Sequence, residues 1–199
     1  MDLFNSAYEG IPPWDIGRPQ REIIRLAEDG EVSGRVLDVG CGTGENALYL
    51  ARQGFEVWGI DAAPAAIKKA KEKARKRGIT VNFLVSDTLE LQSLRTKFDT
   101  VIDCGLFHVL SDEERPIFAA SLSSALFPGG KYFMLCFSEH EPGSFGPRRV
   151  TQAEIRATFG KGWKINYIRE AEFETRFGPE GVKAWLSSIS FLQNSSGTS

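Results

Sequence analysis

Histidine and cysteine are scarce in this sequence, which has two histidines and three cysteines among 199 residues. The cysteines, Cys41, Cys104 and Cys136, are odd in number and widely spaced, so they form no disulfide framework. With so few histidines there is also no zinc-type Cys/His cluster, and we expect no metal site. This cysteine usage fits a reducing, cytoplasmic compartment best.

The sequence also lacks a dominant charge and a long hydrophobic run. Lys and Arg number 24 against 26 Asp and Glu, a net charge of −2, so no overall basic field attracts polyanions. The longest purely apolar run, residues 132–137, is far shorter than the roughly 20 residues that a membrane helix needs. Residues 1–10 include Asp2 and Glu9 and no basic apolar leader. We therefore expect no membrane association and no signal peptide.

Length and composition are those of an ordinary globular protein. The 199 residues, 42% hydrophobic and 25% charged, predict one domain with its own core. We expect this domain to cover residues 1–193. The Ser/Gly/Thr-rich tail, residues 194–199, is expected to be disordered.

Short apolar runs alternate with amphipathic stretches along most of the chain. The runs predict parallel strands covered on both faces, at residues 35–39, 56–60, 80–85, 98–104 and 131–137. Helices are predicted at 45–53, 64–78 and 117–126, and capping boxes at Ser111/Glu114 and Thr151/Glu154. Residues 163–175 and 182–191, separated by a Gly-Pro-Glu-Gly turn, predict a closing antiparallel pair. The alternation predicts a doubly wound α/β fold with helices on both faces of the sheet.

Three alternating glycines follow the first predicted strand, in the sequence Asp38-Val39-Gly40-Cys41-Gly42-Thr43-Gly44-Glu45. At a strand-to-helix turn, glycines let the backbone approach a ligand at the helix N-terminus. A dinucleotide loop would need its third glycine at Glu45, and the Gly-Lys-Ser/Thr ending of a P-loop is missing. Because Asp38 and Glu45 bracket a loop without cations, we expect it to attract an ammonium or sulfonium group rather than a pyrophosphate.

Acidic residues stand at the ends of three predicted strands. Asp38 lies beside the glycine loop, Asp61 ends the second strand, and Asp87 follows the third. Ligands of open α/β sheets lie across the carboxyl ends of the strands, so we expect the three acids to line one crevice. There Asp61 would accept hydrogen bonds from two ribose hydroxyls, Asp87 from an adenine amine, and Asp38 would meet an amino group. Each acid alone also fits a cap or a turn.

Together these residues resemble a known family. The segment from Val36 to Gly44, with Asp61, Ser86-Asp87 and Leu126-Phe127-Pro128-Gly129-Gly130, resembles the motifs of class I S-adenosylmethionine-dependent methyltransferases over roughly residues 15–190. The resemblance implies a Rossmann-like sheet of seven strands, mostly parallel with an antiparallel last strand, and S-adenosylmethionine as the cofactor. The candidate cofactor-binding residues are Trp14, Asp38, Gly40, Cys41, Gly42, Asp61, Ala62, Asp87, Thr88 and Cys104.

Two further segments indicate a branch of this family. Pro13-Trp14-Asp15-Ile16-Gly17-Arg18-Pro19 and Asp103-Cys104-Gly105-Leu106-Phe107-His108 resemble small bacterial enzymes related to thiopurine S-methyltransferases and to mycobacterial methyltransferases of heterocyclic toxins. The Asn/Asp-Pro-Pro-aromatic sequence of enzymes that methylate nucleic-acid bases is missing after the fourth strand. The basic run at residues 68–77 is interpreted as a solvated helix face, so we expect no nucleic-acid partner.

The reacting end is predicted to lie after the fourth strand. His108 is our candidate general base, although a histidine that packs against the next helix or only lines the pocket fits equally. Cys104 is expected to offer its backbone to the cofactor. The apolar leader within residues 1–20 would form a lid, with residues 1–14 ordering over the cofactor. The candidate substrate residues, which suggest a small, flat and mostly apolar acceptor, are Phe4, Phe107, His140 and Arg149.

Three functions remain open from the sequence. The first is an enzyme that methylates O, N or S of a small aromatic or heterocyclic molecule. The second is a non-catalytic module that binds S-adenosylmethionine. The third, a nicotinamide oxidoreductase, is disfavoured by Glu45 in place of the third glycine. We expect a monomer or a weak homodimer.

Overall fold

Seven strands form one sheet in the order β3-β2-β1-β4-β5-β7-β6 in the computed structural model, which describes residues 2–192, with side chains from residue 5 on. Only β7 runs antiparallel to its neighbours, β5 and β6. This confirms the mostly parallel seven-stranded sheet with an antiparallel last strand. The strands are β1 (Arg35–Val39), β2 (Glu56–Asp61), β3 (Asn82–Val85), β4 (Phe98–Cys104), β5 (Leu126–Phe137), β6 (Trp163–Phe173) and β7 (Val182–Phe191).

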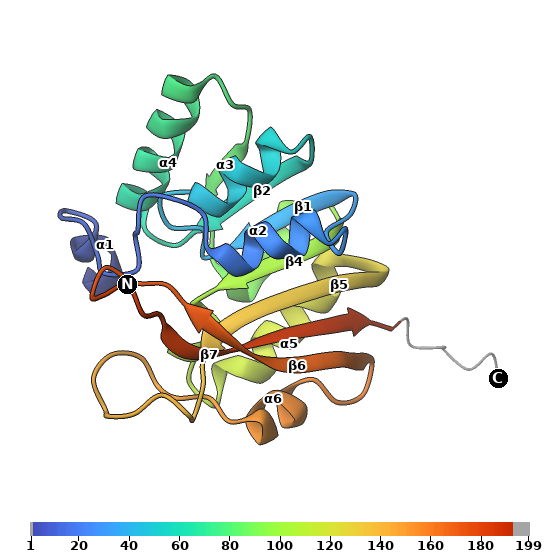
Figure 1. The fold of residues 1–199 in the computed structure, drawn as a ribbon. Coiled ribbons are helices and arrows are strands. Elements are labelled where there is room, and N and C mark those ends of the chain that lie inside the picture. Colours follow the sequence, from blue (N-terminus) through green and yellow to red (C-terminus); the bar gives the residue numbers. More distant parts are fainter. Residues whose placement is uncertain (1, 193–199) are drawn as a thin grey trace.

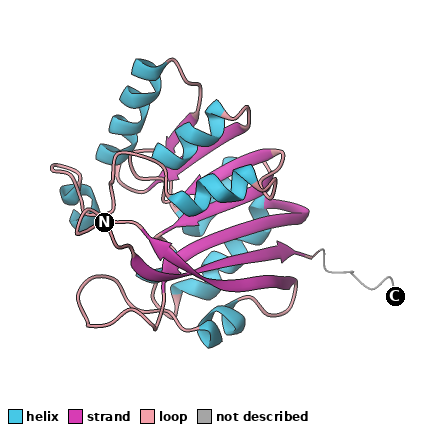
Figure 2. Ribbon diagram, viewed as in Figure 1, coloured by secondary structure: helices cyan, strands magenta, loops and turns pink. Residues whose placement is uncertain are grey.

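Helices cover both faces of the sheet (Figures 1 and 2). Apolar side chains of α2, α3 and α4 form one buried cluster with one face, exemplified by Ile23, Leu48 and Ile67. Those of η1, α5 and α6 form a second cluster, which includes Leu91 and Phe118. The helices are α1 (Asp2–Ala7), α2 (Arg21–Glu28), α3 (Glu45–Arg52), α4 (Pro64–Arg77), η1 (Thr88–Leu94), η2 (Phe107–Val109), α5 (Glu114–Ala125) and α6 (Gln152–Thr158), where η marks a 3-10 helix.

Most predicted elements lie where the sequence places them. The α4 helix ends at Gly78, whose φ of 64° is left-handed, and Thr151 and Glu154 form the predicted capping box of α6. Ser111 and Glu114 also exchange hydrogen bonds, but the α5 helix begins only at Glu114. The strand β5 begins at Leu126, earlier than predicted, because Leu126 already pairs with Phe98 of β4.

The topology gathers three distant segments at one end of the sheet. The strand β1 lies between β2 and β4, so the direction of strand progression reverses there, and this is where open α/β sheets bind ligands. The N-terminal segment, residues 5–20, and the turn between β6 and β7 meet at the same end (Figure 1). A hydrogen bond of 2.9 Å from the Arg176 N–H to the Pro13 carbonyl joins them.

Two further expectations from the sequence concern the C-terminal tail and membrane-spanning helices. The tail at residues 194–199 lies outside the described residues. Within residues 2–192, no helix combines the length and the apolar character needed to cross a membrane.

Candidate functional site

The glycine loop between β1 and α3 turns through left-handed backbone. Gly40 and Gly42 have φ of 66° and 53°, a region that other residues adopt only at a cost. A Cβ atom on Gly42 would lie 2.8 Å from the Tyr8 hydroxyl, and one on Gly44 would lie 2.5 Å from the Phe83 ring. The loop therefore needs glycine both for its turn and for the close approach of neighbouring elements.

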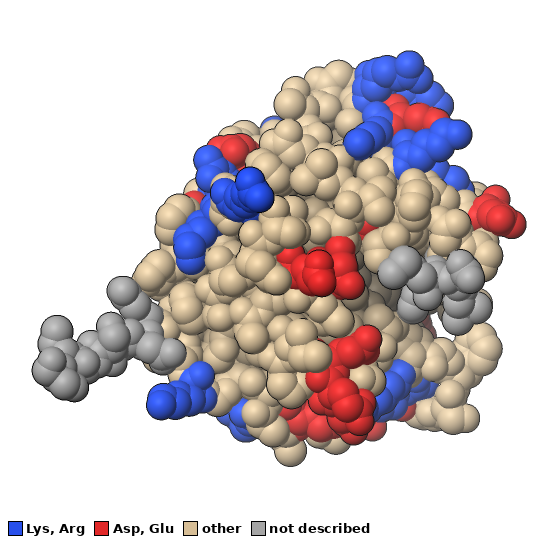
Figure 3. All heavy atoms as spheres, turned by 180° about the vertical axis from the view of Figure 1, so that it is seen from behind, with Lys and Arg blue, Asp and Glu red and all other residues tan. Residues whose placement is uncertain are grey.

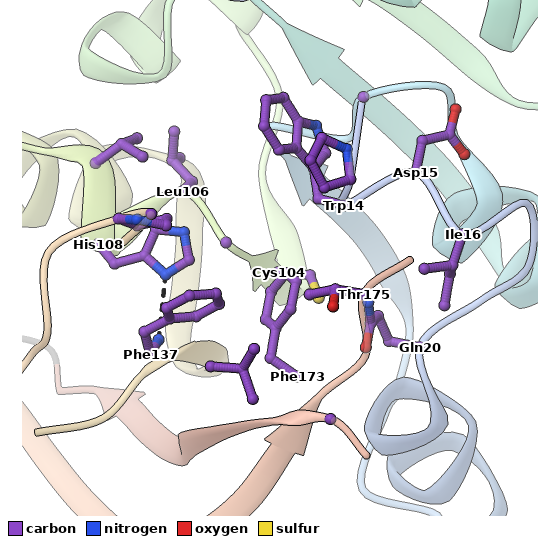
Figure 4. A pocket seen from close by; sticks show the side chains of 18 of the residues that line it. Trp14, Asp15, Ile16, Gln20, Cys104, Leu106, His108, Phe137, Phe173 and Thr175 are labelled. Atoms are coloured by element: carbon purple, nitrogen blue, oxygen red, sulfur yellow. Dashed lines mark hydrogen bonds between the residues drawn. The ribbon is translucent and has the colours of Figure 1, made fainter. Parts of the chain in front are cut away.

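A cavity of about 1290 Å³ lies over this loop, at the carboxyl ends of β1, β2 and β4. Single-ligand pockets typically measure roughly 300–1,000 Å³, so this cavity has room for two ligands side by side. Its other walls come from the N-terminal segment, from residues 141–149 and from the β6–β7 turn. Figure 4 shows Trp14 on one side of the cavity and His108, Phe137 and Phe173 on another.

Asp61 is the acid that faces the cavity from the end of β2. Its two carboxylate oxygens accept hydrogen bonds from the backbone N–H of Gly42, at 2.9 Å, and of Ala63, at 2.8 Å. Burial raises the pKa of Asp61, while these two hydrogen bonds oppose that rise. The bonds fix the carboxylate beside the glycine loop. The predicted cofactor residues that line the cavity with Asp61 are Trp14, Gly40, Cys41, Gly42, Ala62, Thr88 and Cys104.

The other two strand-end acids lie elsewhere, so the expected crevice of three acids is corrected to one. Asp38 is buried beneath the loop, its Oδ2 has no hydrogen-bond partner, and burial raises its pKa well above the ordinary value. Asp87 caps η1, where its carboxylate accepts a hydrogen bond from the Leu89 N–H at 2.9 Å. Neither lines the cavity.

Glu45, the acid that follows the glycine loop, is paired with cations of α4. Its carboxylate lies 2.8 Å from Lys73 Nζ and 2.7 Å from an Arg77 nitrogen. Burial raises the pKa of Glu45, but the hydrogen bonds from Arg77 and Lys73 outweigh it and leave the pKa below its ordinary value. Its charge is thus compensated within the protein, which corrects the expectation that Glu45 attracts a cationic ligand.

The same pairing revises the interpretation of the basic run. Lys and Arg side chains gather over α4, at the upper right in Figure 3. Besides Lys73 and Arg77, Lys69 donates a hydrogen bond of 2.9 Å to the Gly10 carbonyl. The α4 helix therefore contacts both the glycine loop and the N-terminal segment, rather than only solvent.

The N-terminal segment crosses the glycine loop. The Trp14 indole N–H donates a hydrogen bond to the Tyr8 hydroxyl at 3.0 Å. The Thr43 hydroxyl of the loop donates to the Asp15 carboxylate at 2.8 Å. Tyr8, Trp14 and Asp15 of this segment line the cavity beside the glycine loop.

Glu174, just after β6, holds the far end of this segment. Its carboxylate accepts hydrogen bonds from the Arg18 guanidinium at 2.9 and 3.0 Å and from the Arg21 N–H at 2.8 Å. The side-chain amide of Gln20 also exchanges two hydrogen bonds with the Glu174 backbone, at 2.8 and 2.9 Å. No local motif marks these residues, because the contact joins positions more than 150 residues apart.

His108 lines the cavity, but its imidazole is held inside the wall. Nδ1 accepts a hydrogen bond from the Phe137 N–H at 3.1 Å, and the ring packs against Phe137 and Phe173. Burial, with the nearby Arg149, lowers the pKa of His108 to about 3. The ring is therefore neutral at physiological pH, and the geometry does not favour the general base that the sequence suggested.

The candidate substrate residues differ in whether their side chains line the cavity. Phe107 is fully buried in the core, with the Arg115 guanidinium 4.6 Å from its ring centre, so it cannot touch a ligand. His140 lies outside the cavity, 3.4 Å from the Glu170 carboxylate. Arg149 does line the cavity. The side chain of Phe4 lies outside the described residues.

Arg149 uses its guanidinium to hold a loop. It donates hydrogen bonds to the carbonyls of Glu141 at 3.3 Å, Pro142 at 3.2 Å, Phe145 at 3.0 Å and Pro147 at 2.6 Å. These contacts fix the backbone of residues 141–147 at the cavity mouth. Arg149 is therefore a positioning residue for this loop rather than a free cation for a substrate.

Comparisons with known proteins agree with this geometry. Residues 36–130 match the family model described as a methyltransferase domain. The chain is 41% identical to a 2-heptyl-1-hydroxyquinolin-4(1H)-one methyltransferase of Mycobacteroides abscessus, over 86% of this chain and 80% of that protein. It is 29% identical to "Probable thiol methyltransferase 2" of Arabidopsis thaliana, over 92% and 83% of the two chains.

Solved structures show the same fold. One, described as "Conversion of a Disulfide Bond into a Thioacetal Group during Echinomycin Biosynthesis", is 33% identical with a TM-score of 0.90, covering 98% of this chain and 94% of that chain. Another, a magnesium protoporphyrin IX methyltransferase from Synechocystis with bound S-adenosylmethionine, is 25% identical with a TM-score of 0.65, covering 85% and 76%.

Proposed function

The chain belongs to the S-adenosylmethionine-dependent methyltransferases of small molecules, and we propose that it methylates a heteroatom on a flat aromatic heterocycle. The observation that carries this proposal is the composition of the cavity. One end has the glycine loop and Asp61, and the other has aromatic walls and a histidine that is not basic. An acceptor bound there must bring a nucleophile that needs no strong base.

The residues at the first end fit S-adenosylmethionine. We assign the Asp61 carboxylate, already oriented by two backbone N–H groups, to the ribose hydroxyls, and the backbone of Gly40 and Gly42 to the methionine part. Trp14 would cover the cofactor from the opposite side (Figure 4). When bound, the cofactor supplies a methyl group that its sulfonium has already activated. The protein has to align the acceptor with it, and alignment alone lowers such barriers by several kcal/mol.

The second end fits a flat apolar acceptor. Its walls come from Leu106 after β4, Phe137 at the end of β5 and Phe173 at the end of β6. The His108 and Phe137 ring centres lie 4.8 Å apart and those of Phe137 and Phe173 lie 5.3 Å apart, which forms a continuous aromatic surface. Aromatic rings stack favourably on such surfaces. The relative from M. abscessus, named for a 1-hydroxyquinolinone substrate, supports a heterocycle.

The state of His108 restricts the nucleophile. Because the Phe137 N–H occupies Nδ1 and the pKa of His108 is lowered to about 3, its imidazole is a weak proton acceptor at neutral pH. A phenol, with a pKa near 10, would react poorly without a base, whereas a thiol near 8.5 ionises readily in solution. We therefore propose acceptors that ionise near neutral pH, such as N-hydroxy or thiol groups on a heterocycle.

We propose one catalytic domain over residues 1–193 with residues 1–20 as its lid, a monomer or weak homodimer, and no nucleic-acid or membrane partner. The engagement of Lys69, Lys73 and Arg77 with the protein itself supports the absence of a nucleic-acid surface. The three free cysteines support a reducing, cytoplasmic compartment.

The direct test is a screen with methyl-labelled S-adenosylmethionine. Wild-type protein is incubated with matched sets of N-hydroxyquinolinones, heteroaryl thiols and simple phenols, and labelled products are identified by mass spectrometry. We expect turnover of the first two sets and little of the third. Preference for phenols would overturn the proposal, and cofactor binding without any transfer would favour the non-catalytic module.

A further inference from the structure

Arg149 places a positive charge against the aromatic wall of the acceptor end. Its guanidinium carbon lies 5.5 Å from the centre of the Phe137 ring, and its half-buried side chain lines the cavity. His108 packs against the same ring, with the two ring centres 4.8 Å apart (Figure 4). Arg149, Phe137 and His108 therefore belong to one continuous part of the wall.

The charge of Arg149 has no carboxylate partner among residues 5–192, whereas the neighbouring Arg148 pairs with both Asp112 and Glu154. The hydrogen bonds of the Arg149 guanidinium go to carbonyl oxygens of residues 141–147. Carbonyl groups carry no net charge. These bonds therefore fix the guanidinium in place and leave its full positive charge at the cavity wall.

His108 reports the sign of the electrostatic field at this wall. Burial is the largest cause of its lowered pKa, and Arg149 is the charge that lowers it most, ahead of Arg115. A field that disfavours a cation at one position favours an anion at the same position. The wall that opposes protonation of His108 is therefore suited to an acceptor that has lost its proton.

The other ionisable groups around this end leave that charge in place. The Glu141 carboxylate accepts a hydrogen bond from the Lys183 N–H at 2.8 Å, and the side chains of Glu180 and Lys183 are exposed, so that water and salt screen them. Burial raises the pKa of the Cys104 thiol, which is therefore neutral. Asp103 is fully buried behind the wall with a pKa raised by burial to about 7, and it is unchanged in the variants below. Charged groups of the same elements that lie outside the cavity lining are Glu139, His140 and Glu170.

We propose that Arg149 makes this end of the cavity selective for the anionic form of its acceptor, such as a heteroaryl thiolate or the anion of an N-hydroxy group. This inference rests on the proposed function and names the charge state of its substrate. The acceptor gives its proton to water, and the guanidinium favours the anion that remains. A lone pair of that sulfur or oxygen forms the bond to the methyl carbon, the bond from this carbon to the sulfonium sulfur breaks, and its electron pair stays on that sulfur. The anion and the sulfonium thus lose their charges together.

The charge of Arg149 should act mainly on ionisation and binding of the acceptor. Because the negative charge of the acceptor disappears as the new bond forms, the guanidinium stabilises the bound anion more than the transition state. Removing this charge should raise the pKa of the bound acceptor by about one unit, the size of effect that a unit charge several ångströms away has at a partly buried site. At a pH where the acceptor is fully ionised, KM should rise about tenfold while kcat changes less than about threefold.

The test compares each ionisable acceptor with a neutral counterpart of similar shape. 2-Mercaptobenzothiazole is paired with 2-(methylthio)benzothiazole, and 1-hydroxyquinolin-4(1H)-one with 1-methoxyquinolin-4(1H)-one. For the full-length protein saturated with S-adenosylhomocysteine, calorimetry gives Kd and ultraviolet absorbance gives the pKa of the bound acceptor. S-adenosylhomocysteine has no sulfonium, so the measurement isolates the charge of the protein. In the wild type, the pKa of the bound acceptor should lie about one unit or more below its value in water.

Three variants separate the charge of Arg149 from its contacts with the loop. Arg149→Gln removes the charge and keeps a donor for the loop carbonyls, so it should weaken binding of the anion about tenfold and of the neutral counterpart less than about threefold. Arg149→Lys keeps the charge and should retain most of the lowered pKa. The matched control is Arg148→Gln, which should behave as the wild type because Arg148 is already paired and does not line the cavity. Circular dichroism establishes that each variant is folded.

The outcomes separate this inference from the proposed function. If the wild type transfers a methyl group to neither acceptor, the proposed function fails. If it transfers the group but the wild-type complex does not lower the pKa of the acceptor, Arg149 does not select the anion and the function stands, whatever the variants do. If Arg149→Gln weakens binding of the anion and of its neutral counterpart equally, Arg149 acts only through the loop, and the inference is again wrong.

Discussion

The backbone N–H of Phe137 donates a hydrogen bond to Nδ1 of His108 across 3.1 Å, linking the end of β5 to the turn after β4. This bond uses the lone pair that a general base would need at that nitrogen. Burial lowers the pKa of His108 to about 3, so the neutral ring completes the cavity wall. This is the basis for our proposal that the acceptor ionises without help from a protein base.

The first prediction concerns the replacement of His108 by asparagine, which keeps an acceptor for the Phe137 N–H. We expect less than about a tenfold loss of kcat, because base catalysis would contribute about 10²–10⁴. The pH–rate profiles of His108→Asn and the wild type should share one shape from pH 5.5 to 8.5. A limb near pH 6.5 that disappears in the variant would restore His108 as the base.

The free energy of unfolding should depend on pH through His108. The folded-state pKa of His108 lies near 3 and the unfolded value near 6.5, so only the unfolded state gains this proton as the pH falls below 6.5. At pH 5.5, relative to pH 8, wild type should lose about 1.4 kcal/mol of unfolding free energy that His108→Asn does not lose. Urea unfolding at the two pH values measures this difference.

The second prediction tests Asp61 as the cofactor anchor. Asp61→Ala should weaken binding of S-adenosylhomocysteine by about 1.5–3 kcal/mol, the range for a hydrogen bond to a charged group. Asp29→Ala, which changes an exposed acid at the end of α2, is the control. Calorimetry with an unchanged dissociation constant for Asp61→Ala would remove this residue from the site.

A third prediction concerns Glu174, which ties the N-terminal segment to β6 through Arg18 and Arg21. Glu174→Ala should raise the hydrogen-exchange rate of residues 8–20 about tenfold or more, since two partly buried charge pairs and the hydrogen bond from the Arg21 N–H are lost. Glu172→Ala, which loses only an exposed contact of 3.4 Å to Arg21, serves as the control. In the wild type, S-adenosylhomocysteine should slow exchange in this segment. Equal exchange with and without the ligand would rule out a lid.

The fourth prediction uses Glu154, which joins α5 to α6. Burial raises its pKa, but hydrogen bonds from Thr151, Arg115 and Arg148 outweigh it and lower the pKa to about 2. Glu154→Gln should therefore lower the free energy of unfolding at pH 7 by about 1.5–3 kcal/mol. Because the folded pKa is below the unfolded one, this stabilisation is present above about pH 4.5 and disappears as the pH falls towards 2.

The exposed Glu113 gives the matched control, and Glu113→Gln should change the unfolding free energy by less than about 0.5 kcal/mol. An equal loss in the two variants at pH 7 would show that the hydrogen bonds of Glu154 add nothing specific.

Much of the fold follows from local sequence patterns. Continuous apolar runs bounded by turns predicted the parallel strands, because both faces of those strands are covered. Glycine and proline marked the ends of α4, at Gly78 and Pro64. The start of β5 was placed too late because Pro128 and two glycines interrupt the apolar pattern there, while Leu126 already pairs with Phe98.

Several residues that line the cavity were predictable because they follow a strand directly. Gly40, Gly42 and Asp61 stand at strand ends, where the fold itself directs them to the cavity. Phe107 and His108 are neighbours in η2, and the turn of that helix sends one side chain into the core and the other to the cavity. Gln20 and Glu174 meet only through tertiary structure, so no sequence pattern marks them.

The central claim is that this cavity joins S-adenosylmethionine to a heterocycle that supplies its own nucleophile. The most direct measurement is methyl transfer to a 1-hydroxyquinolin-4(1H)-one between pH 5.5 and 9, in the wild type and His108→Asn. We expect labelled N-methoxy product in both, with kcat/KM rising in parallel as the acceptor ionises. Absence of product in the wild type, or a rise governed by a protein group that is lost in the variant, would contradict the claim.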